Sequence, residues 1–126
     1  RLRLTLSDSL VVASTFHLEP AGQTLRTDIA NGIVIVPMHL PDGYTAIVRN
    51  RAPADRFQPH SNARPMSLRD YLKAHEIPAP VRDLLPLLVV NDTIAWVLGI
   101  GHEASAPFAA TEATATHVGI LTRVPA

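Results

Sequence analysis

Apolar positions recur with a period of two over several short stretches of the chain, and with helical spacing over one stretch near its middle. Residues 1–6 alternate polar and apolar side chains, a pattern typical of a strand that buries one face. The β-branched run at 33–36 and the stretch 44–48 flank a Pro-Asp-Gly turn, so residues 33–48 are predicted to form a β-hairpin. Pro37 favours an edge position or a bulge for the first of these strands. Further strands are predicted at residues 10–17, 87–90, 94–98 and 117–124.

The stretch with helical spacing begins at Ser67, whose hydroxyl can cap a helix, and an Ile-Pro pair ends it. The stripe on its apolar side consists of Leu68, Tyr71, Leu72 and His75. A single further helical turn fits residues 79–85. Residues 49–66 are predicted to form a long polar loop. The sequence Asn-Asp-Thr at 91–93 predicts a second hairpin with a three-residue loop.

Strands therefore dominate, with a short helical insertion in the middle of the chain. This order favours an α+β, mainly β fold: a small β-sandwich or partly open barrel with one or two short helices inserted mid-chain. A length of 126 residues predicts a single domain over 1–126 that can bury a core without disulfides.

Charge is distributed unevenly, although the net charge of the chain is zero. Residues 49–73 hold six basic and two acidic groups, a net charge of +4, whereas the flanking segments are net negative. A neutral total argues against a general polyanion binder, but a local basic patch can still contact phosphates. The basic residues of this segment are Arg49, Arg51, Arg56, Arg64, Arg69 and Lys73.

The basic turn has two interpretations. Its arginines either contact phosphates or form a solvated turn in which Asp55 pairs with Arg49, Arg51 or Arg56. Phe57 could stack on a base but could equally anchor the loop in the core.

Residue patterns of common catalytic and metal sites do not occur. The chain has no cysteine, none of its six histidines has metal-ligand spacing, and neither a GxSxG motif nor a GxxxxGK[ST] loop is found. We therefore predict no catalytic residue and no metal site. No apolar run approaches the ~20 residues that span a membrane, so we expect no membrane contact and a cytoplasmic location. Trp96 is predicted to lie in the core.

Several segments, taken together, resemble a known family. The sequence IVRNRAPADRFQP is similar to a strand and turn that the family writes as VRxRxxGDRFxP. The following SLRDYLKAHEIPAPVRDLLPLLVVNDTIAWVLGI resembles its short helix, R-D pair, hairpin and W-V-x-G strand, and APFAATEAT resembles its closing segment. The family is the C-terminal domain of bacterial tRNA(Ile)-lysidine synthetase. The resemblance covers roughly residues 44–124, with residues 1–43 as N-terminal strands of the same unit.

The resemblance implies a parent enzyme that uses ATP to join lysine to the wobble cytidine of an isoleucine tRNA. Its catalytic N-terminal domain carries an SGGxDS loop, which this chain lacks, so we expect a non-catalytic fragment of a longer protein, one that binds no cofactor itself. The implied partners are that catalytic domain and the acceptor stem of the tRNA. By position, Arg49, Arg51, Asp55 and Arg56 match the basic turn of the family, Arg69 a basic helix position, and Arg82 with Asp83 the R-D pair. The candidate RNA-binding residues are then Arg49, Arg51, Arg56, Arg64, Arg69, Lys73 and Arg82.

Two alternatives remain open. The β-rich body could serve as a structural module that docks on the catalytic domain or forms a homodimer, with weakened RNA binding. It could also be an independent small enzyme, which would need a pocket of histidine and carboxylate groups. Internal ion pairs at Arg49, Arg51 and Arg56 would favour the structural role, whereas one open basic face would favour RNA binding.

Overall fold

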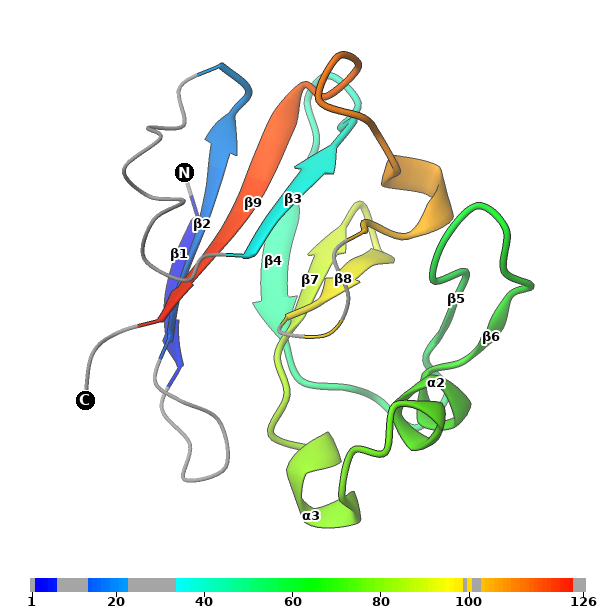
Figure 1. Ribbon diagram of the computed structural model, residues 1–126. Helices are drawn as coiled ribbons and strands as arrows, with labels where there is room; N and C mark the ends of the chain where they lie inside the picture. The colour runs from blue at the N-terminus through cyan, green and yellow to red at the C-terminus, as the bar shows by residue number, and fades with distance from the viewer. Residues whose placement is uncertain (1, 7–13, 23–33, 99, 101–102, 124–126) are drawn as a thin grey trace.

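The computed structural model describes residues 2–6, 14–22, 34–98, 100 and 103–123, and two antiparallel sheets form most of it (Figure 1). The first sheet has the order β1-β2-β9-β3 and consists of β1 (Leu2–Leu6), β2 (Ser14–Pro20), β9 (His117–Arg123) and β3 (Val34–Met38). The second has the order β4-β7-β8 and consists of β4 (Ala46–Arg49), β7 (Leu87–Val90) and β8 (Thr93–Val97).

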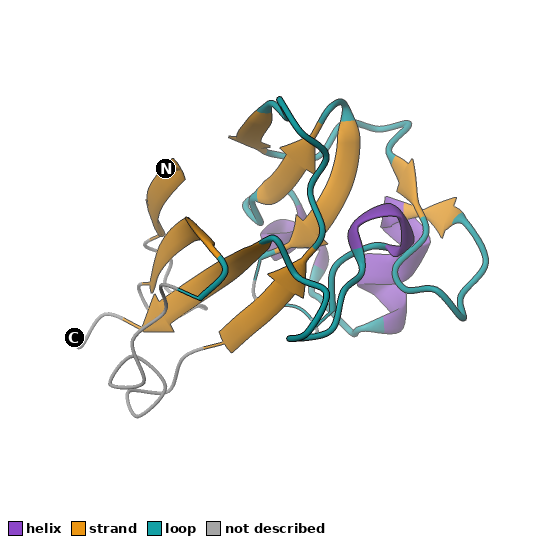
Figure 2. Ribbon diagram, turned by 90° about the horizontal axis from the view of Figure 1, so that it is seen from above, coloured by secondary structure: helices purple, strands orange, loops and turns teal. Residues whose placement is uncertain are grey.

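Shorter elements lie on the side of the second sheet that faces away from the first sheet, as Figure 2 shows from above. A two-stranded hairpin of β5 (Arg56–Phe57) and β6 (Met66–Ser67) leads directly into helix α2 (Leu68–Ala74). Helix α3 (Ala79–Arg82) follows, and a 3-10 turn, η1 (Ala106–Phe108), lies between β8 and β9. No helix among the residues given above is both long and apolar enough to cross a membrane.

Strand β7, in the middle of the second sheet, is buried on both faces. Along β7, Leu88 and Val90 face the first sheet, while Leu87 and Val89 face the helices, so all four residues are buried. A continuous apolar run is typical of a strand that is covered on both sides. The sandwich core contains Phe16, Val36, Met38, Trp96 and Leu121, and the second core contains Phe57, Leu68, Leu72, Val81 and Ile94.

Trp96 lies in the sandwich core, as expected, at 2% exposure. Its indole Nε1 donates a hydrogen bond of 2.9 Å to the carbonyl of Ile100, so no polar group of the ring is left unpaired. Gly119 of β9 lies beneath this cluster: a Cβ there would approach Cε of Met38 to 2.9 Å. The glycine therefore leaves room for the side chains of Met38 and Phe16, which come from the two neighbouring strands of the same sheet.

The mainly β class with short mid-chain helices is confirmed, and so is the edge position of the Pro37 strand. The prediction of a hairpin over 33–48 is wrong, because β3 pairs with β9 and β4 pairs with β7. The turn itself forms, with Tyr44 N donating to Pro41 O at 3.2 Å and Gly43 at φ 70°. It carries the chain from one sheet to the other, since both strands bury a face in the core between them.

Other boundaries differ by a few residues. The second hairpin has a two-residue loop, because Thr93 already pairs with Val90, and Asn91 and Asp92 take φ values of 48° and 65°. Such left-handed values at both positions are typical of tight hairpin turns. The 49–66 loop contains the short β5–β6 pairing. Parts of the predicted strands, at 10–13, 33 and 124, lie outside the described residues.

Candidate nucleic-acid interface

The turn after β4 is organised around the Asp55 carboxylate. Arg49 donates two hydrogen bonds to it, from NH1 to Oδ2 at 2.8 Å and from NH2 to Oδ1 at 2.9 Å. The backbone N–H of Ala52 donates a third, to Oδ2 at 2.7 Å. The carbonyl of Asp55 in turn accepts from the backbone N–H of Leu68, the first residue of α2, at 2.9 Å. One residue thus couples the basic turn to the start of the helix.

The mutual hydrogen bonds keep both groups of this ion pair charged and outweigh burial, which acts in the opposite direction. The side chain of Asp55 is 12% exposed and that of Arg49 is 34% exposed. The hydrogen bonds from Arg49 lower the pKa of Asp55 below its ordinary value, and the same bonds raise the pKa of Arg49. A two-point pair of this kind also fixes the orientation of the guanidinium group. Arg49 therefore stabilises the conformation of the turn through its contacts with Asp55.

Two further arginines are engaged by their neighbours. Arg51 Nε lies 2.7 Å from Asp83 Oδ1, which joins the basic turn to the segment after α3. Asp83 is 75% exposed, so this pair is expected to add only ~0–1 kcal/mol to stability. Arg82 Nε donates to the carbonyl of Ile77 at 2.8 Å. Both contacts position the chain between the helices and the turn.

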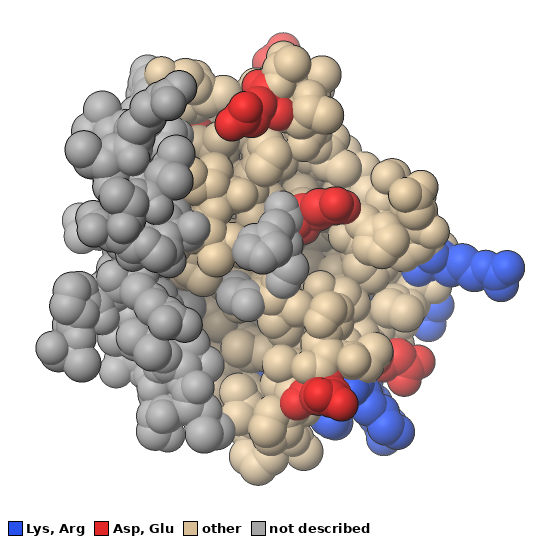
Figure 3. All heavy atoms as spheres, viewed as in Figure 1, with Lys and Arg blue, Asp and Glu red and all other residues tan. Residues whose placement is uncertain are grey.

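The remaining four basic candidates extend into solvent. Arg56 lies on β5, Arg64 in the loop between β5 and β6, and Arg69 and Lys73 on α2, and all four are exposed. Within the described part of the chain, none of them forms an ion pair or a side-chain hydrogen bond. Figure 3 shows the visible basic side chains over the hairpin and the helices, with acidic side chains beside them as well as near the centre and at the top of the molecule.

Internal ion pairs favour the structural role, and one open basic face favours RNA binding. This criterion divides the seven candidate residues into two groups. Arg49 and Arg51 form internal pairs, and Arg82 binds a carbonyl, whereas Arg56, Arg64, Arg69 and Lys73 extend from one hairpin-helix unit. We call these last four residues the basic flank. An RNA-binding role for any of the seven residues stays a prediction.

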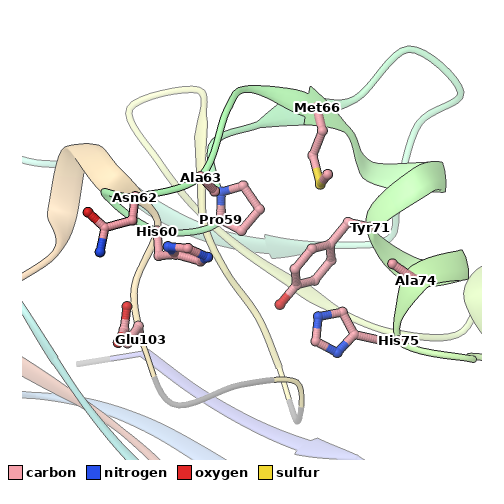
Figure 4. A pocket seen from close by; sticks show the side chains of 9 residues that line it. All are labelled: Pro59, His60, Asn62, Ala63, Met66, Tyr71, Ala74, His75 and Glu103. Atoms are coloured by element: carbon pink, nitrogen blue, oxygen red, sulfur yellow. The ribbon is translucent and has the colours of Figure 1, made fainter.

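A pocket of about 590 Å³ lies next to the flank, between the β5–β6 loop and α2. Figure 4 shows the rings of His60, Tyr71 and His75 around it, with Glu103 below His60. Tyr71 packs edge-on against Phe57, at 4.8 Å between ring centroids, and is tilted against His75 at 4.4 Å. Burial raises the pKa of the Tyr71 hydroxyl, which therefore stays protonated.

Sequence reasoning missed this pocket. It assigned Tyr71 and His75 to the apolar stripe of the helix, but only Leu68 and Leu72 of that stripe are buried. The sequence signal for the pocket was that two positions of this stripe, Tyr71 and His75, carry rings with polar groups. Among the described residues, no three His, Asp or Glu side chains come together as a possible metal site.

Comparisons with known proteins agree on one family. The family described as the TilS substrate C-terminal domain matches residues 46–119. The tRNA(Ile)-lysidine synthase of Nitrosomonas europaea is 37% identical over 88 residues, which cover 70% of this chain and 19% of that protein. The tRNA(Ile)-lysidine synthase of Dehalococcoides mccartyi is 30% identical over 103 residues, which cover 79% of this chain and 21% of that protein.

A solved structure described as "Crystal structure of TILS C-terminal domain" has a TM-score of 0.58 to this chain at 19% sequence identity. The match covers 98% of this chain and 92% of that one, so the two share a fold. The matched regions span only 11% to 21% of the length of the curated relatives.

Proposed function

Because the chain belongs to the family of TilS substrate C-terminal domains, we propose that it is the non-catalytic tRNA-binding domain of a tRNA(Ile)-lysidine synthase. In this proposal the parent enzyme acts in the cytoplasm and uses ATP to join lysine to the wobble cytidine of an isoleucine tRNA. The chemistry belongs to the catalytic N-terminal domain of the parent chain. The domain described above binds the acceptor stem and so orients the tRNA.

One observation carries this proposal: four exposed cations extend from a single hairpin-helix unit that internal contacts hold in place. The sequence-independent part of RNA binding comes from basic side chains that replace counterions on the phosphates. Long, unpaired arginine and lysine side chains suit this purpose because no internal carboxylate competes for them. By the criterion given in the sequence analysis, the internal pairs of Arg49 and Arg51 favour the structural alternative, whereas the exposed Arg56 favours RNA binding.

The test is the salt dependence of binding to a short acceptor-stem RNA hairpin. For four phosphate contacts, a plot of log affinity against log salt should have a slope of roughly −3 to −4. Arg56→Ala, Arg64→Ala, Arg69→Ala and Lys73→Ala should each reduce the slope by about one. Fluorescence anisotropy at several salt concentrations between 50 and 200 mM, roughly the range over which the effect is large, gives the slope.

Glu112→Gln serves as a control for net charge, because it changes the charge by one, in the opposite direction, at an exposed position outside the basic flank. It should leave the slope unchanged. Affinity that is indifferent to salt, or four alanine variants that all keep the wild-type slope, would remove the basis for this function.

A second candidate function is favoured by the exposure of Ile47 and Leu84, at 47% and 59%. They are the exposed large hydrophobic side chains among the described residues, and each would be removed from water if another domain or a second copy packed over it. Sedimentation of the chain at rising concentration distinguishes a homodimer from a monomer. RNA binding and docking can coexist, since neither residue belongs to the basic flank.

A further inference from the structure

The pocket between the β5–β6 loop and α2 is not used by the phosphate contacts proposed above. Three rings surround it: His60 comes from the loop, and Tyr71 and His75 come from the helix (Figure 4). Met66 and Ala74 add apolar surface. A planar, partly apolar ligand matches this lining better than a small ion does.

Internal contacts hold the walls of the pocket. Gln58 Nε2 donates to the carbonyl of Ala63 at 2.8 Å, and Ala63 N donates to the carbonyl of His60 at 3.1 Å, so the loop is folded on itself. The carbonyl of Gln58 accepts from Ala106 N at 3.0 Å, which ties the loop to η1. On the other wall, Phe57 fixes the ring of Tyr71 from the core side. A site with fixed walls loses little conformational entropy when a ligand binds.

The charge of the lining indicates the chemical class of the ligand. No lysine or arginine lines the pocket, and Glu103 places a carboxylate at it, so a phosphate would be repelled. A carboxylate accepts hydrogen bonds from an exocyclic amino group, as in cytosine and adenine. Proteins that bind single-stranded RNA commonly stack unpaired bases on aromatic and histidine rings.

We propose that this pocket receives one unpaired nucleobase that carries an exocyclic amino group. The backbone of the same RNA strand would run toward Arg64, which lies in the loop that forms one wall. This inference rests on the proposed RNA-binding function and adds base recognition to it. Cytosine, adenine and guanine, which all carry such a group, are favoured over uracil, which has no amino group to donate to Glu103.

Methyl-labelled methionine provides a direct test, because the chain has only two methionines. Met66 lines the pocket, and Met38 is fully buried in the sandwich core and serves as the internal control. NMR titrations would use three probes: a cytidine tetranucleotide, a uridine tetranucleotide and ribose 5-phosphate. The Met66 methyl signal should shift with the cytidine probe, shift at roughly tenfold higher concentration with the uridine probe, and stay in place with ribose 5-phosphate.

Two variants test the roles of individual side chains. His75→Ala should weaken cytidine binding about tenfold through loss of a stacking ring, and His75→Phe should restore it. Glu103→Gln should reduce the preference for cytidine over uridine. Equal shifts with all probes, or a response to ribose 5-phosphate, would overturn base recognition.

The outcomes also separate this inference from the function on which it rests. If the Met66 signal stays in place while the RNA hairpin still binds with a steep salt dependence, the pocket proposal fails and the basic flank stands. If the cytidine probe shifts Met66 but hairpin binding is indifferent to salt, base recognition stands and the phosphate-binding role of the flank fails.

Discussion

Asp55 contributes more to the organisation of the candidate surface than any single arginine does. Its side chain accepts hydrogen bonds from Arg49 and from the backbone of Ala52, and its own carbonyl accepts from Leu68. Removal of the carboxylate would release the guanidinium of Arg49 and open the turn. In our proposal, Arg49 therefore binds no RNA itself but helps to fix the turn from which Arg56 extends.

Asp55→Asn should destabilise the fold by about 2 kcal/mol, because it removes charge-assisted hydrogen bonds from a largely buried group. The lowered pKa of Asp55 means that its contribution is present above the ordinary aspartate pKa and is lost as the pH falls through the lowered folded-state value. Urea unfolding at neutral and acidic pH measures this effect. The variant should lose the part of the acid sensitivity that Asp55 causes, and the exposed Asp42→Asn should behave like the wild type.

Helix α2 shows how a short element is ended by its backbone. Ile77 N donates to Leu72 O at 3.0 Å and Glu76 N donates to Lys73 O at 3.0 Å, the pair of bonds that defines a Schellman motif. The residue at the left-handed position is Glu76, with φ 57°. Glycine usually occupies this position because a Cβ is disfavoured there.

Glu76→Gly should therefore stabilise the protein by about 1 kcal/mol, since the relief of backbone strain exceeds the entropy lost by glycine. Thermal unfolding gives the result as an increase in Tm. Glu76→Ala is the matched control: it removes the same carboxylate but keeps a Cβ, so most of the strain should remain. An alanine variant as stable as the glycine variant would assign the effect to charge instead.

Local signals in the sequence predicted this helix, whereas contacts between distant segments could not be foreseen. Ser67 accepts a hydrogen bond from Asp70 N at 3.1 Å, a cap visible within four residues of sequence. The partner of β3 is β9, about 80 residues later, so the Pro-Asp-Gly turn alone could not show that no hairpin forms. The Arg51–Asp83 pair and the pocket wall at Glu103 likewise depend on the tertiary fold.

At the scale of the whole molecule, the second sheet, β4-β7-β8, lies between two hydrophobic cores. Alternate residues of β7 enter the sandwich core and the core beneath the helices. Neither core can lose its packing without exposing one face of that strand. The cores should therefore unfold together, as expected of a single domain.

Trp96 fluorescence reports on the sandwich core, and the methyl resonances of Leu68 and Leu72 report on the helical side. Both sets of signals should change at the same urea concentration. Val89→Ala, in the second core, should lower both midpoints equally, at a cost of about 2 kcal/mol. Two separate midpoints would divide the chain into independently folding parts.

The position of β9 between β2 and β3 sets a condition on assembly during synthesis. Both neighbours are translated long before β9, and neither can pair with it until the ribosome has released the chain through residue 123. In that interval each presents a row of unsatisfied backbone donors and acceptors, the arrangement that templates aggregation. The nascent polypeptide thus passes through a stage at which its unpaired strands are open to aggregation and to binding by chaperones.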